Sequence, residues 1–96
     1  MIKHTVTFKL KYSKGSEEES IFLKAARELR SIPGVEKFEC LRQISAKRHF
    51  DYALSMNFDS METYNTYSEH PEHTAFVRKY WAAYVEDFLE LDYELM

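Results

Sequence analysis

The sequence predicts an α+β fold with the element order β-α-β-β-α-β, in which both helices cover one face of a four-stranded antiparallel sheet of strand order 4-1-3-2. Three observations lead to this prediction. Apolar and polar residues alternate over residues 2–11 and 50–58, apolar residues recur at helical spacing over residues 17–31, and a second helical stretch is broken near Pro71. This element order is the split βαβ, or ferredoxin-like, arrangement.

Length and composition indicate one folded domain, residues 1–96. The formal net charge of −3 argues against a nucleic-acid-binding protein, which usually carries a basic stripe. No run approaches the ~18 apolar residues of a membrane-spanning helix, so we expect no membrane association and a cytoplasmic location. The single cysteine, Cys40, has no partner for an internal disulfide and is expected to be a buried structural thiol.

The first predicted strand, residues 2–11, has one apolar side and one polar side. The polar side carries lysines and threonines. The apolar side includes a histidine, His4, among Ile2, Val6, Phe8 and Leu10. A histidine on the side that faces the core needs a polar partner there.

The first helix is predicted over residues 17–31. Ser16 and Glu19 have the spacing of a capping box, and three consecutive glutamates suit the positive end of the helix dipole. The dipeptide Pro33-Gly34 is expected to end this helix.

Two further strands, Val35–Ile44 and residues 50–58, are predicted to form a hairpin around a short polar turn. In the first of them, Phe38, Cys40 and Ile44 share one side. In the predicted sheet order the first and third strands are neighbours, so their apolar sides form one surface beneath the helices. On their opposite sides these two strands carry few large apolar residues, so that face of the sheet is expected to meet water or a second copy of the chain.

The second helix is predicted over residues 60–68, with Asp59 as its N-cap. Pro71 disfavours a helical His70, so the helix breaks there, Pro71 begins a new helix and His70 caps it. The inward face of the new helix carries His73, Phe76, Val77, Tyr80 and Tyr84. Trp81 falls off this face and is expected at a helix edge or in an interface.

The last strand is predicted from the alternation between Phe88 and Leu95. Its acidic residues are too widely spaced to form a carboxylate pair and are interpreted as the polar side of the strand. They are Glu86, Asp87, Glu90, Asp92 and Glu94.

The candidate site is the layer between sheet and helices, where His4 and His73 point toward each other and Tyr67 lies on the inward stripe just before the break. Burial and the helix dipole are expected to keep His73 neutral, so it can accept a proton, while Tyr67 can donate to an oxyanion. Two interpretations stay open: a hydrogen-bonded core network, or a site that handles a ligand. No metal site is expected, because Pro71 places His70 outside the helix that carries His73.

Three segments resemble the stress-responsive α/β-barrel (Dabb) domain family. They are M-I-K-H-T-V-T-F-K-L at the start, Y-x-x-H-P-x-H-x-x-F at residues 67–76, and D-F-L-E-L-D-Y-E near the end. The resemblance implies a protomer that dimerises through its sheet face into an α/β barrel. Polyketide cyclases of the olivetolic acid cyclase type share this domain, which implies His73 as a base, Tyr67 as its partner and His4 nearby. The expected pocket wall differs from that of these cyclases, because its side chains are bulky enough to fill the space; it comprises Phe22, Tyr52, Leu54, Phe76, Tyr80 and Tyr84.

The resulting hypothesis is a homodimer that holds a small apolar or aromatic molecule near His73. The alternative is a cofactor-free acid–base enzyme, a cyclase or isomerase, in which His73 abstracts a proton, Tyr67 stabilises the enolate and His4 orients the substrate. A haem- or quinone-handling monooxygenase of the related dimeric barrel type is a third possibility, but the sequence lacks the expected cues. No cofactor is expected in either of the first two cases.

Overall fold

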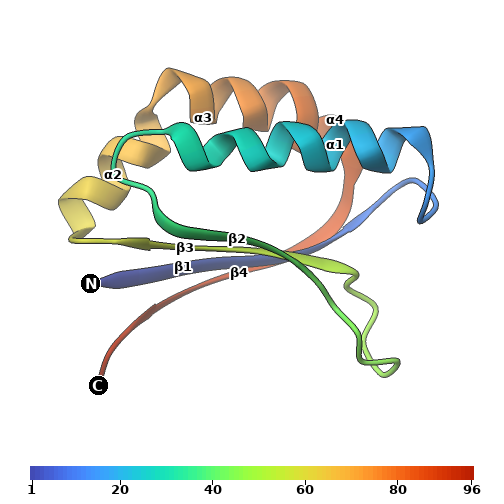
Figure 1. Cartoon of the computed structure of the whole chain (residues 1–96), viewed down its shortest axis with the longest axis horizontal. Coiled ribbons are helices and arrows are strands. Elements are labelled where there is room, and N and C mark those ends of the chain that lie inside the picture. Colours follow the sequence, from blue (N-terminus) through green and yellow to red (C-terminus); the bar gives the residue numbers. More distant parts are fainter.

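The computed structural model describes all residues from Met1 to Met96 and shows one antiparallel sheet with every helix on the same face (Figure 1). The strands are β1 (Ile2–Leu10), β2 (Glu36–Arg42), β3 (Tyr52–Phe58) and β4 (Val85–Glu94). Their order, β2-β3-β1-β4, is the predicted order read from the other edge. The helices are α1 (Glu17–Arg27), α2 (Met61–Glu69), α3 (Pro71–Phe76) and α4 (Ala82–Tyr84). The predicted α+β, ferredoxin-like fold is confirmed.

The central strands β1 and β3 supply most of the sheet's share of the core. His4 lies opposite Met56 and Phe8 lies opposite Tyr52, so the apolar sides predicted for the two strands do form one surface. All four of these side chains are buried. The helices cover this surface, while the opposite face of the sheet carries no helix (Figure 1).

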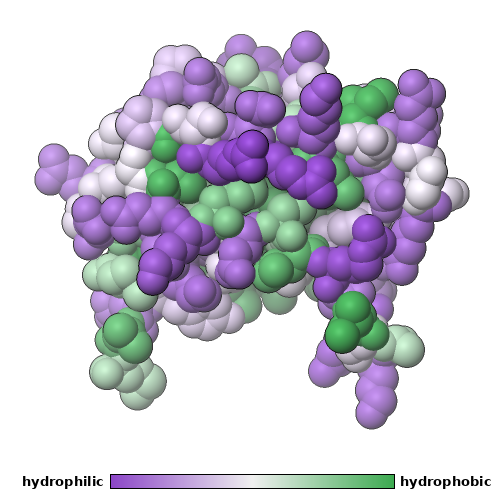
Figure 2. All heavy atoms as spheres, in the orientation of Figure 1, coloured by the Kyte–Doolittle hydropathy of each residue, from purple (hydrophilic) through white to green (hydrophobic).

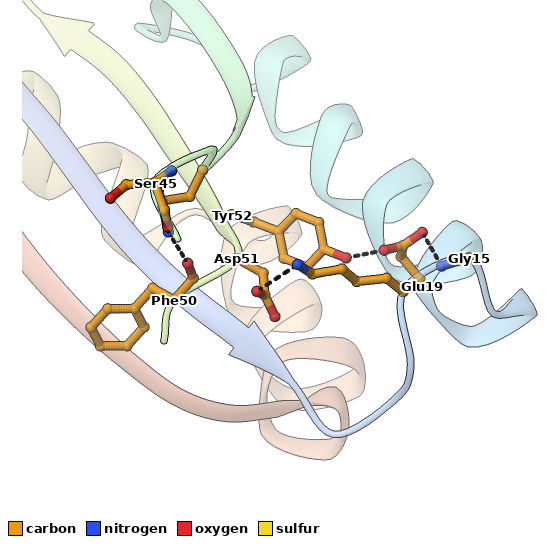
Figure 3. A network of polar contacts seen from close by, with 8 residues as sticks. Gly15, Glu19, Ser45, Phe50, Asp51 and Tyr52 are labelled. Atoms are coloured by element: carbon orange, nitrogen blue, oxygen red, sulfur yellow. Dashed lines mark hydrogen bonds and ion pairs between the residues drawn. The ribbon is translucent and has the colours of Figure 1, made fainter. Parts of the chain in front are cut away.

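The start of α1 is fixed by a polar cluster that differs in part from the predicted capping box. Ser16 accepts a hydrogen bond from the backbone N–H of Glu19, as expected. The Glu19 carboxylate does not return to Ser16, however. It accepts from the backbone N–H of Gly15 and from the hydroxyl of Tyr52, so the helix is tied to β3 (Figure 3). The α-helix also ends earlier than predicted, at Arg27, and continues as a 3-10 turn over Glu28–Ser31.

The broken second helix has the predicted break but a different first cap. The extended backbone and side-chain hydrogen bond of an N-cap belong to Ser60, and Asp59 was therefore the wrong prediction. Helix α2 ends at Glu69, and its C-cap, His70, is also extended and precedes Pro71. His70 Nδ1 accepts from the backbone N–H of Glu72, so the predicted cap of α3 is confirmed.

A π-helical turn, Val77–Trp81, joins α3 to α4 and changes which residues face inward. Hydrogen bonds from i to i+5 place an extra residue in the turn, so later side chains are rotated relative to a regular helix. Trp81, expected at a helix edge or in an interface, is instead half-buried, with its ring 5.2 Å from Phe8 and 5.5 Å from Phe88 between centroids. The expectation that Trp81 falls off the inward face was wrong, because the sequence pattern gave no sign of the π turn.

Strand β4 begins at Val85, earlier than predicted, and its register decides what lies beside the helices. Asp92 lies opposite His4, and Glu90 lies opposite Val6. The acidic side of this strand therefore lies on the same side of the sheet as the helices. Asp92, interpreted from the sequence as part of the polar side of the strand, is exposed and also hydrogen-bonds to the buried His4.

The edge strands make the outer face of the sheet more apolar than the central strands suggest. Four large apolar residues of β2 and β4 lie on this face, and each is about half exposed, from 44% to 52%. They are Leu41, Leu89, Leu91 and Tyr93. Ile44, predicted on the same side of the strand as Phe38 and Cys40, lies beyond the end of β2 and is 92% exposed. Figure 2 shows hydrophobic side chains on the two projections below the body: at the tip of the C-terminal end, and above the hydrophilic tip of the β2–β3 loop. No helix of the chain has the length and apolar character needed to cross a membrane.

Candidate functional site

A half-open pocket of about 330 Å³ lies between the sheet and the helices that cover it, next to β4. Four segments form the helical side of this pocket: the 3-10 turn, α2, α3 and the π turn. The wall is mostly hydrophobic and is formed by His4, Val6, Leu29, Leu54, Met56, Tyr67, His73, Phe76, Val77, Trp81, Phe88 and Glu90. The three predicted functional residues, His4, Tyr67 and His73, therefore line one cavity.

His73 is held in a defined tautomer. Its Nδ1 lies 3.0 Å from the carbonyl oxygen of Ser68, and a carbonyl only accepts, so Nδ1 carries a proton. Burial lowers the pKa of His73, with a further lowering from His4, and these effects outweigh the Ser68 carbonyl and the Glu90 carboxylate, which raise it. Neutral His73 thus leaves Nε2 as a hydrogen-bond and proton acceptor.

His4 is held by two residues that the sequence analysis did not assign to the site. Its Nδ1 lies 2.6 Å from Asp92 Oδ1 and 2.9 Å from the hydroxyl of Tyr64. The Tyr64 hydroxyl donates to the other Asp92 oxygen at 3.0 Å. Since the carboxylate only accepts, Nδ1 of His4 donates to it and Nε2 is left as the remaining polar atom of the ring.

Tyr67 completes the corner from the end of α2. Its ring lies 4.6 Å from that of His73 and 6.4 Å from that of His4, between centroids. Burial raises the pKa of Tyr67, and the Glu90 carboxylate raises it further, so the hydroxyl stays protonated and available as a donor.

Three polar atoms of this corner have no partner within the protein: His4 Nε2, Tyr67 Oη and His73 Nε2. The buried side-chain atoms that lack a hydrogen bond are Ser55 Oγ and Asn57 Oδ1, on the other side of the sheet. None of the three corner atoms is among these fully buried atoms, and the residues that carry them line the same pocket. A small apolar cavity with a few convergent polar atoms is the usual form of a ligand site.

Only part of the predicted pocket wall lies in this pocket. Leu54 and Phe76 line it, whereas Phe22 is fully buried in the core. Tyr52 does not line it, because its hydroxyl is bonded to Glu19 at the far end of the sheet layer (Figure 3). Tyr80 lies in a separate groove of about 380 Å³ between α1 and α3, which includes none of the histidines. Tyr84 is half-buried and packs against Phe22 and Tyr80.

The sequence analysis missed Asp92, Glu90 and Tyr64 as site residues for a common reason. Tyr64 lies one turn before Tyr67 on the same side of the helix, but nothing in the sequence paired it with β4. The only available signal was the pairing of the first and last strands, which brings Asp92 beside His4 once the register is known.

The remaining histidines and the cysteine lie outside the pocket. No group of three or more His, Cys, Asp or Glu side chains is arranged to hold a metal ion. His49 is exposed and lies 2.9 Å from Asp87. Cys40 is half-buried, and burial raises the pKa of its thiol, which keeps it in the unreactive protonated form.

The lowered pKa of His73 predicts a loss of stability in mild acid. Unfolded His73 has its ordinary pKa of 6.5, so below that pH the unfolded chain binds a proton that the folded chain resists. Stability contributed by neutral His73 is present above this pH and is lost as the pH falls through the window below it. In thermal unfolding from about pH 7.5 to about pH 5, wild type should lose more Tm than His73→Gln. Equal losses in the two proteins would contradict the assignment.

Comparisons with known proteins agree with the observed fold. The family model described as Stress responsive A/B Barrel Domain (Dabb) matches residues 2–95. A search of curated proteins found no match. A crystal structure of a Dabb family protein with a ferredoxin-like fold from Mesorhizobium loti is 47% identical, with a TM-score of 0.96, and the match covers 99% of this chain and 96% of that one.

Two further solved structures are more distant. A dimeric protein of unknown function from Bacteroides fragilis is 28% identical, with a TM-score of 0.76 and coverage of 98% and 95% of the two chains. A hydroxynitrile lyase from Passiflora edulis has a TM-score of 0.85 over 99% and 93% of the chains. Its identity is 16%, so it shows a shared fold alone.

Proposed function

The chain belongs to the stress-responsive A/B barrel (Dabb) family, and on that basis we propose that it binds a small apolar or aromatic molecule in the pocket beside His73. The observation that supports this most directly is that His4, Tyr67 and His73, each with one polar side-chain atom that has no partner, line one mostly apolar cavity. A polar group of a ligand can accept from the Tyr67 hydroxyl and donate to a histidine Nε2, while its apolar body fills the space toward Phe76 and Trp81.

The second candidate is a cofactor-free acid–base enzyme, and the state of His73 favours it. A neutral imidazole with a free Nε2 can take a proton from carbon or oxygen, and the protonated Tyr67 hydroxyl can stabilise the resulting oxyanion. His4, held by Asp92, would orient the substrate. In this scheme the base, the oxyanion donor and the orienting group come from three different elements that share one pocket.

We also propose a homodimer that forms through the outer face of the sheet. The Bacteroides fragilis relative is dimeric, and the outer face of this chain exposes four large apolar side chains from its edge strands. Exposed apolar residues that gather on one uncovered face are typical of an interaction surface. A cytoplasmic location stays a prediction from the sequence.

Ligand binding can be tested by thermal shift with a panel of one- and two-ring aromatic carbonyl compounds. A ligand at about 100 times its Kd should stabilise wild type by about 2.7 kcal/mol. Val77→Trp, which introduces a large side chain at a 39% exposed wall position, should abolish this stabilisation without disturbing the core. Stabilisation that survives in Val77→Trp would place the ligand elsewhere and contradict the proposal.

The same ligands separate the two candidates. If the protein is an enzyme, wild type should convert a bound compound, and His73→Ala should lower its kcat by about 10²–10⁴-fold. Undiminished turnover in His73→Ala would exclude His73 as the base. Binding without conversion in wild type would favour the binding protein over the enzyme.

A further inference from the structure

The wall of the pocket carries one formal negative charge and no basic side chain from lysine or arginine. Among its twelve residues, Glu90 is the only carboxylate. His73 is neutral, since burial lowers its pKa. Any positive charge on the ring of His4 is balanced by Asp92 at 2.6 Å. The nearby Arg78 lines a separate open hollow that shares His73 and Val77 with the pocket but lies outside the pocket wall.

Glu90 reaches this position through the register of the edge strand. It lies opposite Val6 on β1, on the side of the sheet that faces the helices, between Phe88 and Asp92. The negative charge of Glu90 acts on this corner: it raises the pKa of Tyr67 after the larger effect of burial, and that of Tyr64 after burial and the Asp92 carboxylate. A ligand that contacts Tyr67 therefore lies within the same field.

The volume limits the size of the ligand. A closed apolar cavity of about 150 Å³ admits benzene, and this pocket, at about 330 Å³, is roughly twice as large. The space therefore suits a compact molecule of one or two rings. Most of the lining is apolar, so the ligand's polar group must lie at the corner formed by His4, Tyr67 and His73.

We propose that Glu90 makes this pocket selective for compact neutral ligands, namely aromatic or alicyclic carbonyl and hydroxyl compounds, over carboxylates of the same shape. This inference rests on the proposed ligand-binding function. Tyr67 donates to a carbonyl or hydroxyl oxygen of the ligand, and a histidine Nε2 accepts from a hydroxyl. A carboxylate in the same place meets the Glu90 charge, and no lysine or arginine of the pocket wall offsets the repulsion.

The test uses cinnamamide and cinnamate, which match in shape and differ in charge, with calorimetric titration of the full chain. Wild type should bind cinnamamide about tenfold more tightly than cinnamate at low salt. Glu90→Gln keeps the shape of the side chain and removes its charge. The preference for cinnamamide should therefore fall about tenfold, so that the variant binds the two probes about equally. About 1 M salt, which shortens the Debye length to about 3 Å, should narrow the wild-type preference.

Glu86→Gln is the matched control, because it removes the same charge from the same strand at a position outside the pocket. It should leave the preference unchanged. Equal binding of the two probes by wild type, or an unchanged preference in Glu90→Gln, would overturn the charge selection while ligand binding itself stands. Failure of wild type to bind either probe, or binding that persists in Val77→Trp, would overturn both the selectivity and the proposed pocket.

Discussion

Replacing Phe58 with alanine is expected to lower the free energy of unfolding by about 3–5 kcal/mol, the usual cost of emptying a large aromatic site in a core. Phe58 is 0% exposed. Its ring stacks on Tyr64 at 5.1 Å and lies 5.0 Å from Tyr67 and 6.4 Å from His4, between centroids. The same side chain therefore supports both the core and the polar corner of the pocket.

This loss is large for a chain of 96 residues, because domains of this size are commonly stable by only about 5–15 kcal/mol. Urea unfolding followed by far-UV circular dichroism, at one fixed protein concentration, measures the change. A second effect is expected at the site. With Phe58 removed, Tyr64 and Tyr67 lose the surface that sets their distance from His4, so any ligand should bind more weakly to the folded variant.

Phe58→Leu is the control that separates packing from the aromatic contact. Leucine fills most of the space, so the stability loss should be smaller, about 1–2 kcal/mol. If Phe58→Ala and Phe58→Leu lose similar amounts, or if alanine costs less than about 1 kcal/mol, the core around the corner is not packed as described.

The fold could be predicted from the sequence because its main elements have strong local signals. The alternation of β1 and β3 fixes which side of each strand is buried, and a one-residue error would move His4 from the core to solvent. The break at Pro71 follows from the geometry of proline, and it explains why His73 lies in the first turn of a new helix. The sequence therefore predicts one residue of the pocket wall on the sheet, His4, and one on the helices, His73.

The partners of those residues could not be predicted in the same way. Asp92 and Glu90 lie on an edge strand whose two sides are both largely exposed, so the buried and exposed sides do not differ enough to fix its orientation. Only the register with β1, a contact between the two ends of the chain, puts Asp92 beside His4. The π turn is likewise invisible to a search at regular helical spacing, and it brings Trp81 to the pocket in place of Tyr80.

The outer face of the sheet leads to the second large effect: Leu91→Arg is expected to convert a dimer into a monomer. Leu91 lies opposite Thr5 on β1, and its side chain is 45% exposed on the face that no helix covers. In a sheet-to-sheet dimer this leucine is buried among apolar residues of both protomers. An arginine there must lose its hydration without a matched carboxylate, which strongly disfavours association.

Sedimentation equilibrium at micromolar concentration measures this directly. Wild type should have twice the chain mass of 11.5 kDa, and Leu91→Arg should have the mass of one chain. Ile21→Arg is the matched control, since Ile21 is similarly exposed, at 41%, but lies on α1. It should remain dimeric, and unchanged far-UV circular dichroism should show that both variants fold. Wild type at 11.5 kDa, or a dimeric Leu91→Arg, would contradict association through this face. Because Leu91 and Glu90 are neighbours on β4 with side chains on opposite faces of the sheet, a monomeric Leu91→Arg that still binds ligand would show that each protomer holds a complete pocket.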